Sequence, residues 1–178
     1  SLNLVLYPEA GLGIAKKLKQ LYGTDYYVCD TLPVGFKAVE QMVKDICEIL
    51  ACDPTPALLE SERARALCYA KINDIYHMCG LPKGVGFYIK GMPSQEKAFS
   101  QFLRQYLGMI PVPMEEAELV FSDANVISEM MLLNKTFCGI EINLPGMGYT
   151  DIVTKTHLGI NGAKLLCEQV LNGLMSKL

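Results

Sequence analysis

The chain has 178 residues, of which 51% are hydrophobic and 20% charged, and its net charge is −3. This composition supports a packed core and excludes a disordered chain. The acidic balance and the lack of a basic run argue against a nucleic-acid-binding surface. No apolar run reaches the roughly 18 residues of a membrane span, so we expect neither a nucleic acid nor a membrane as partner.

The seven cysteines are an odd number, and most lie within apolar segments: Cys29, Cys47, Cys52, Cys68, Cys79, Cys138 and Cys167. Together with the lack of a secretory leader, they predict a reducing, cytoplasmic compartment and no disulfide framework. Cys47 and Cys52 are near each other in the sequence, but no second pair lies beside them. Because structural zinc and iron–sulfur sites need four ligands at suitable spacing, we expect no metal site in this chain.

The first third of the chain predicts two strands, 2–7 and 25–30, each followed by a helix, 8–23 and 33–51. The segment "AGLGIAKK" after the first strand resembles a dinucleotide-binding loop. Lys16 stands where that fingerprint requires a third glycine or alanine. The simpler interpretation is a glycine-containing loop that lets the helix pack close to its strand.

A long helix follows, over residues 56–79. Thr55 is expected to cap it and Pro56 suits its first turn. At about 1.5 Å per residue it would extend roughly 35 Å, enough to connect two units of the fold. A narrow apolar stripe runs along it: Ala64, Cys68, Ile72, Ile75 and Cys79.

The rest of the chain again alternates between strands and helices. Its predicted strands are 84–91, 109–113, 117–123 and 137–143, and its predicted helices are 94–108, 125–134 and 159–178. Such alternation is typical of parallel strands, so we expect a Rossmann-like doubly wound parallel sheet in a three-layer α/β/α arrangement. The expected units are residues 1–54 as the C-terminal portion of one Rossmann-like domain, 55–80 as the connecting helix, and 81–178 as a Rossmann-like C-terminal domain.

Five segments in this order resemble the C-terminal part of the nitrogenase component 1 superfamily. They are "IAKKLKQLYGTDYY", "LPVGFKAVEQMV", "ESERARALCYAKINDIYHMCGLPKGVGFYIKG", "FLRQYLGMIPV" and "HLGINGAKLLCEQVLNGL". The superfamily includes the nitrogenase iron–molybdenum protein subunits, their cofactor-assembly scaffold and the dark-operative protochlorophyllide reductases. No single segment is specific for this family, but the ordered set is.

The resemblance implies low-potential electron transfer in a protein of three Rossmann-like domains, of which this chain is the C-terminal part. The electrons would come from a separate iron-protein ATPase and pass through an iron–sulfur cluster held outside this chain. A homologous component 1 subunit would be the second partner. The chain alone is then expected to be inactive and to hold no cofactor.

The resemblance also implies which loops face the substrate cavity. In nitrogenase a cysteine and a histidine hold the catalytic cofactor, and Tyr7 and Tyr149 stand near their expected positions in this sequence. We therefore expect a substrate other than dinitrogen. The candidate cavity residues are Tyr7, Pro33, Gly35, Lys37, Gly146, Gly148 and Tyr149. Gly35 would allow close approach, whereas Tyr7 could instead fill an interface with a preceding domain.

No Ser-His-Asp or Cys-His arrangement can be assembled from the spacing, so no catalytic residue is assigned. Two other functions are open at this point: a cofactor-assembly scaffold without turnover, and a small-molecule binding module. A neighbouring gene for an iron-protein ATPase would favour electron transfer over both.

Overall fold

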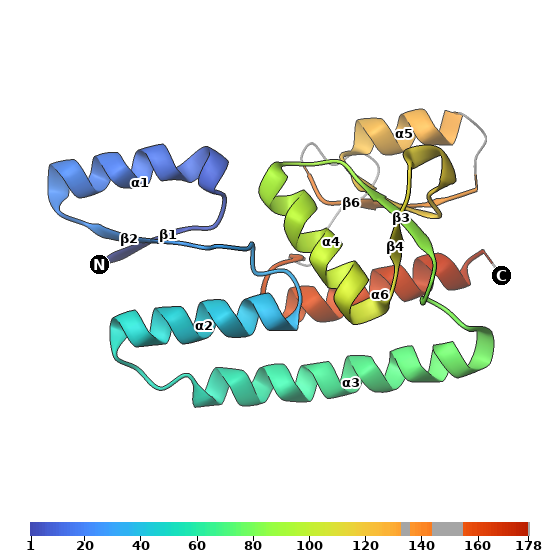
Figure 1. Ribbon diagram of the computed structural model, residues 1–178, viewed down its shortest axis with the longest axis horizontal. Coiled ribbons are helices and arrows are strands. Elements are labelled where there is room, and N and C mark those ends of the chain that lie inside the picture. The colour runs from blue at the N-terminus through green and yellow to red at the C-terminus, as the bar shows by residue number, and fades with distance from the viewer. Residues whose placement is uncertain (133–135, 144–154, 178) are drawn as a thin grey trace.

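The computed structural model describes residues 1–132, 136–143 and 155–177 (Figure 1). Its helices are α1 (Pro8–Tyr22), α2 (Phe36–Leu50), α3 (Thr55–Cys79), α4 (Pro93–Leu107), α5 (Ala124–Leu132) and α6 (Gly159–Met175), with a 3-10 turn η1 (Met114–Glu116). Its strands are β1 (Leu2–Val5), β2 (Asp25–Val28), β3 (Gly86–Ile89), β4 (Ile110–Pro111), β5 (Leu119–Ser122) and β6 (Cys138–Glu141). Every predicted helix and strand is present, and most of the strands are shorter than predicted. None of the described helices is long and apolar enough to cross a lipid bilayer.

The strands form two parallel sheets, which confirms the predicted α/β class. β1 pairs with β2, and the other four strands are ordered β4-β3-β5-β6. Helices α5 and α6 cover opposite faces of the larger sheet (Figure 1). Side-chain alternation along β6 shows this directly: a Cβ at Gly139 would meet Ile127 of α5, whereas the Cys138 thiol lies against Gly173 of α6.

The chain reverses its winding direction between β3 and β5. From β3 it passes to β4 on one side and then returns to β5 on the other side. The register aligns Phe87 with Leu119 and Ile89 with Phe121, so β3 and β5 end side by side. The carboxyl ends of these two strands therefore flank a topological switch point, where open α/β sheets bind their ligands.

Helix α3 lies beneath α2 and α6 and packs against both (Figure 1). Its 25 residues correspond to about 37 Å. The predicted cap was wrong, because the Asp53 carboxylate, not Thr55, accepts the first free N–H, that of Thr55, at 2.9 Å. Gly80, with φ of 80°, ends the helix. The buried residues of α3 are small: Ser61, Ala64 and Cys68. The buried Ser61 hydroxyl donates to Glu40 of α2 at 2.8 Å, which satisfies its polar atom.

The loop before α2 enters the main hydrophobic core. Leu32, Val34 and Phe36 are at most 3% exposed and share one cluster with residues of the four-stranded sheet and of α4 and α6. The N-terminal segment up to α2 is therefore anchored by the same core as the C-terminal sheet. The division of the chain into units 1–54, 55–80 and 81–178 stays a prediction.

Gly35 makes this entry possible. Its φ of +78° is a conformation that L side chains rarely adopt, and a Cβ at this position would overlap the Phe102 ring of α4. Phe102 is itself stacked on Tyr106, with 5.2 Å between the ring centroids, so the ring has little room to move. The close approach expected at Gly35 is therefore to the protein's own core.

We expect Gly35→Ala to lower the free energy of unfolding by about 2–4 kcal/mol, from the overlap with Phe102 and the positive φ together. Gly13→Ala is the matched control, because Gly13 lies inside α1 with no atom within 4 Å of its added Cβ. That control should be neutral or more stable by up to about 1 kcal/mol. Urea unfolding of the two variants measures the difference, and equal stabilities would contradict this account of the core.

Candidate functional site

A crevice of about 670 Å³ lies where several parallel strands end, and we call it the switch-point crevice. Its lining residues follow four different strands or begin α4: Tyr7, Lys90, Gly91, Met92, Gln95, Asp123, Ile142 and Asn143. Tyr7 follows β1 of the smaller sheet, and the others belong to the larger sheet or to α4. The crevice thus lies between the two sheets, at the carboxyl ends expected for a ligand site.

Gln95 holds the rim of the crevice in place. It is 3% exposed, although its side chain is polar. Its Oε1 accepts the Met92 N–H at 2.9 Å, and its Nε2 donates to the Ile142 carbonyl at 3.3 Å. One buried amide therefore joins the loop after β3 to the segment after β6. Gly91 permits this arrangement, because an added Cβ would lie 2.8 Å from Gln95 Oε1.

A second buried hydrogen bond fixes the end of β3. The Ser122 hydroxyl, with no exposed surface, donates to the Lys90 carbonyl at 3.1 Å. Asp123 is fixed as well, because its Oδ1 accepts the N–H groups of Asn125 and Val126 at the start of α5. The crevice is therefore lined by a positioned backbone and a capping carboxylate.

Tyr7 is held by its own backbone. Its carbonyl accepts the N–H groups of Ala10 at 3.1 Å and Gly11 at 2.8 Å, as the residue that precedes α1. The half-buried ring packs against the main hydrophobic cluster. These contacts fix the start of Tyr7 while one part of the residue lines the crevice.

Glu9 connects the N-termini of α1 and α4 near the crevice. Its Oε1 accepts the Ser94 hydroxyl at 2.5 Å and the Ser94 N–H at 3.3 Å. These hydrogen bonds favour the charged form, so the pKa of the Glu9 carboxyl lies below its usual value. The carboxylate also suits the positive end of the α4 dipole.

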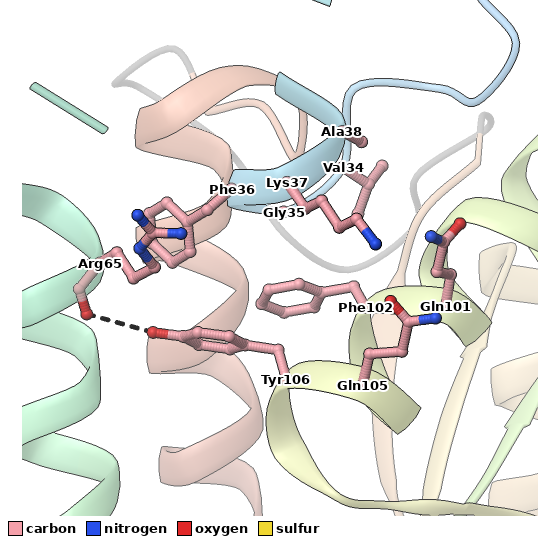
Figure 2. Close-up of a pocket in the computed structure, with 10 residues that line it drawn as sticks. All are labelled: Val34, Gly35, Phe36, Lys37, Ala38, Arg65, Gln101, Phe102, Gln105 and Tyr106. Atoms are coloured by element: carbon pink, nitrogen blue, oxygen red, sulfur yellow. Dashed lines mark hydrogen bonds between the residues drawn. The ribbon is translucent and has the colours of Figure 1, made fainter. Parts of the chain in front are cut away.

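The remaining predicted cavity residues lie elsewhere. Gly35 and Lys37 line a smaller pocket of about 190 Å³ together with Arg65, Phe102 and Tyr106 (Figure 2). Pro33 is buried, and its carbonyl accepts the Gly159 N–H at 2.9 Å. The structure therefore does not bring the 31–37 loop and Tyr7 to one pocket. The other three predicted residues, Gly146, Gly148 and Tyr149, lie outside the described residues.

The sequence interpretation missed the polar residues that share the crevice with Tyr7: Lys90, Gln95, Asp123 and Asn143. Three of them lie at or near the end of a predicted strand, so the strand-end rule could have found them. Gln95 could not be found this way, because it lies one turn into α4.

The crevice offers nitrogen and oxygen groups but no thiolate or imidazole among its lining residues. Within residues 1–132, 136–143 and 155–177, no three His, Cys, Asp or Glu side chains are grouped as a metal ion would require. An iron–sulfur cluster therefore does not fit the described residues. The arrangement suits an organic molecule held by one aromatic ring, one ammonium group and amides.

His157 also lies outside the crevice lining. Its Nε2 is 2.7 Å from Gln169 Oε1, and its ring meets Phe99 edge-on with 5.7 Å between centroids. Burial lowers the pKa of this imidazole, because a buried cation is poorly solvated. These contacts give His157 a structural role between α4 and α6.

The model of one protein family, described as nitrogenase component 1 type oxidoreductase, matches residues 1–115. The chain belongs to the nitrogenase component 1 family. This confirms the resemblance seen in the sequence. The matched residues include Tyr7, Lys90 and Gln95 of the crevice, whereas Asp123 and Asn143 lie beyond them.

Two curated members of the nitrogenase component 1 family match a 78-residue stretch, and both are described as the same subunit of light-independent protochlorophyllide reductase. The protein from Methylobacterium radiotolerans is 28% identical and that from a Bradyrhizobium species 30% identical. Each match covers 44% of this chain but 14% of the relative.

A solved structure described as nitrogenase Cp1 at pH 6.5 superposes with a TM-score of 0.70 and 14% identity. It covers 99% of this chain, and this chain covers 45% of it. At this identity the likeness shows the fold alone. It confirms the α/β architecture with parallel sheets.

Gln95→Met should lower the free energy of unfolding by about 2 kcal/mol, because it leaves the Met92 N–H and the Ile142 carbonyl without their partner. Gln101→Met is the matched control, since Gln101 is also on α4 but partly exposed. Urea unfolding gives both values. An equal effect of the two substitutions would show that the amide of Gln95 does not hold the rim.

The Glu9–Ser94 contact predicts a pH dependence. Because the folded pKa of Glu9 is lowered, its stabilisation is present above the unfolded pKa of about 4.3 and is lost as the pH falls through the folded pKa. The wild type should therefore melt at a higher temperature than Glu9→Gln at pH 7, and the gap should narrow below about pH 4. Glu48→Gln, at an exposed site on α2, should show no such gap. A gap that is constant with pH would contradict the prediction.

Proposed function

We propose that the chain is the C-terminal part of a nitrogenase-like component 1 oxidoreductase subunit. The subunit passes low-potential electrons to a substrate bound in the switch-point crevice. The electrons come from an iron-protein ATPase and travel through an iron–sulfur cluster held by residues outside this chain. A homologous component 1 subunit is the other partner. Membership of the family supports this proposal, and so does the crevice at the strand ends.

The substrate is a flat organic molecule, not dinitrogen. The observation that carries this step is Tyr7 in the crevice lining, with no cysteine or histidine beside it. Iron–sulfur centres are held by soft thiolates, whereas a phenol is a harder oxygen donor. A tyrosine ring instead stacks on flat apolar ligands, and its hydroxyl donates a hydrogen bond. The named substrate of the two curated relatives, protochlorophyllide, is a molecule of this flat type.

The other crevice residues complete this binding mode. The Lys90 ammonium is available to an acidic group of the substrate, and the amide of Asn143 supplies a donor and an acceptor. Gln95 acts indirectly by fixing the loop that carries Lys90. We also propose that the 31–37 loop, with Pro33, Gly35 and Lys37, and the segment with Gly146, Gly148 and Tyr149 contribute to the cavity of the complete protein.

The protein works in the cytoplasm under this proposal. The odd number of cysteines favours a reducing compartment, and low-potential electron transfer requires one. The chain alone is inactive, because the cluster and the ATPase lie outside it.

The test uses the full-length protein purified with its partner subunit, with the iron-protein ATPase supplied for turnover. Bound metal, acetylene reduction and ATP-dependent reduction of protochlorophyllide, used as the probe, are measured. We expect iron and sulfide without molybdenum and no acetylene turnover. Molybdenum together with acetylene reduction would overturn the proposal. Tight binding of an organic ligand or cofactor without any turnover would favour the assembly scaffold instead.

Variants of Tyr7 test its role in the same assay. Tyr7→Ala should lower kcat/KM for the probe about tenfold, a loss of about 1.4 kcal/mol that corresponds to one aromatic contact. Tyr7→Phe should cost several-fold less, since it keeps the ring. Tyr22→Phe, at a tyrosine that is 74% exposed on α1, is the control and should change nothing. An unchanged kcat/KM in Tyr7→Ala would assign Tyr7 to packing alone.

A further inference from the structure

Helix α2 ends in a turn that places two cysteines against each other. The N–H of Cys52 donates to the Cys47 carbonyl at 2.9 Å, and the N–H of Ala51 donates to the Glu48 carbonyl at 3.3 Å. Ala51 adopts the left-handed conformation, with φ of 51° and ψ of 46°. This pattern of six-to-one and five-to-two hydrogen bonds is a Schellman motif. It leaves the backbones of Cys47 and Cys52 one hydrogen bond apart.

The Schellman motif usually brings two apolar side chains into contact, from the residues that close its longer hydrogen bond. Here these two side chains are thiols. Cys47 is partly buried and Cys52 is exposed, and neither is in a disulfide. Hydrogen bonding to Cys52 raises the pKa of the Cys47 thiol, which shows that the sulfur atoms face each other.

Other thiols of the described chain lack one of these two properties. Cys68 of α3 and Cys167 of α6 also face each other, but they are 7% and 3% exposed and closed to soluble reagents. Cys79 is exposed, yet its described sulfur contacts are the Ile75 carbonyl and the Met175 thioether, not another thiol. Among the described residues, Cys47 and Cys52 are therefore the thiol pair that is both adjacent and accessible.

We propose that Cys47 and Cys52 are a modification site that forms a reversible intramolecular disulfide by exchange with a low-molecular-weight disulfide. The exposed Cys52 thiolate attacks one sulfur of the small disulfide, forms a mixed disulfide and releases the first small thiol. The Cys47 thiolate then attacks the Cys52 sulfur, closes the protein disulfide and releases the second small thiol. Two protein thiols are oxidised and one disulfide is reduced to two thiols, with the two protons of the protein thiols taken up by the products.

The closed disulfide fixes the connection between α2 and α3. Four residues separate the two cysteines, and Asp53, which caps α3, follows at once. Oxidation therefore fastens the end of one helix to the cap of the next. The site depends only on this turn and its exposure, so it stands apart from the proposed electron transfer.

The test incubates the reduced full-length protein with glutathione disulfide under anaerobic conditions, followed by acid quenching, alkylation and peptide mass analysis. Trypsin leaves both cysteines in the peptide 45–63, so the disulfide appears as an unalkylated peptide lighter by two hydrogen atoms. We expect this species in the wild type, and dithiothreitol should reverse it. A glutathione adduct that persists on Cys52, or two cysteines that stay open to alkylation, would overturn the proposal.

Single substitutions separate the two chemical steps. Cys47→Ser removes the resolving thiol, so the glutathione adduct on Cys52 should accumulate at least about tenfold over the wild type. Cys79→Ser is the control and should leave the disulfide unchanged. Ala51→Gly keeps the left-handed turn and relieves its steric cost, so the disulfide should still form. Failure of Cys47→Ser to accumulate the adduct would show that Cys47 does not resolve it.

Discussion

The position of the small N-terminal sheet depends on the burial of one loop. Two parallel strands alone cannot bury enough surface to be stable, so β1 and β2 need support from elsewhere. Leu32, Val34 and Phe36 provide it by entering the core of the larger sheet. Their entry requires the positive φ of Gly35, and the Phe102 ring occupies the space that any side chain there would need. The location of Tyr7 at the end of β1 follows from this contact.

The crevice is a product of topology joined to a few buried polar contacts. Parallel strands that wind in opposite directions leave a gap at their carboxyl ends, and Tyr7 closes that gap from the side of the smaller sheet. The Gln95 amide and the Glu9–Ser94 contact then connect the parts that surround it. Since each lining residue comes from a different strand end, the chemistry of the crevice can change by single substitutions without disturbing either sheet.

The sequence predicts the elements of this fold well because each depends on local chemistry. Apolar spacing, prolines in first turns and glycines at helix ends define the helices, and short apolar runs define the strands. The family could also be inferred, from an ordered set of segments that are each unspecific. These signals are contained in neighbouring residues, so no tertiary contact is needed to interpret them.

The site was harder to predict, because facing a cavity or the core is decided by distant residues. The 31–37 loop has the composition of a ligand loop, yet its apolar residues turn inward because Phe102, far along the chain, lies opposite Gly35. Tyr7 was identified from the family resemblance, whereas Lys90 and Asn143 share its crevice through the order of strands in the sheet. That order cannot be obtained from periodicity.

The narrow contact of α3 has an evolutionary consequence. Ser61, Ala64 and Cys68 occupy successive turns of one face, and their small size sets how closely the helix approaches α2 and α6. Natural selection on this helix then acts mainly on side-chain volume at three positions, while its wide outer surface is free to drift. Homologues could differ at most positions of α3 and still keep its place in the fold, so percentage identity along this helix understates how closely two such proteins are related.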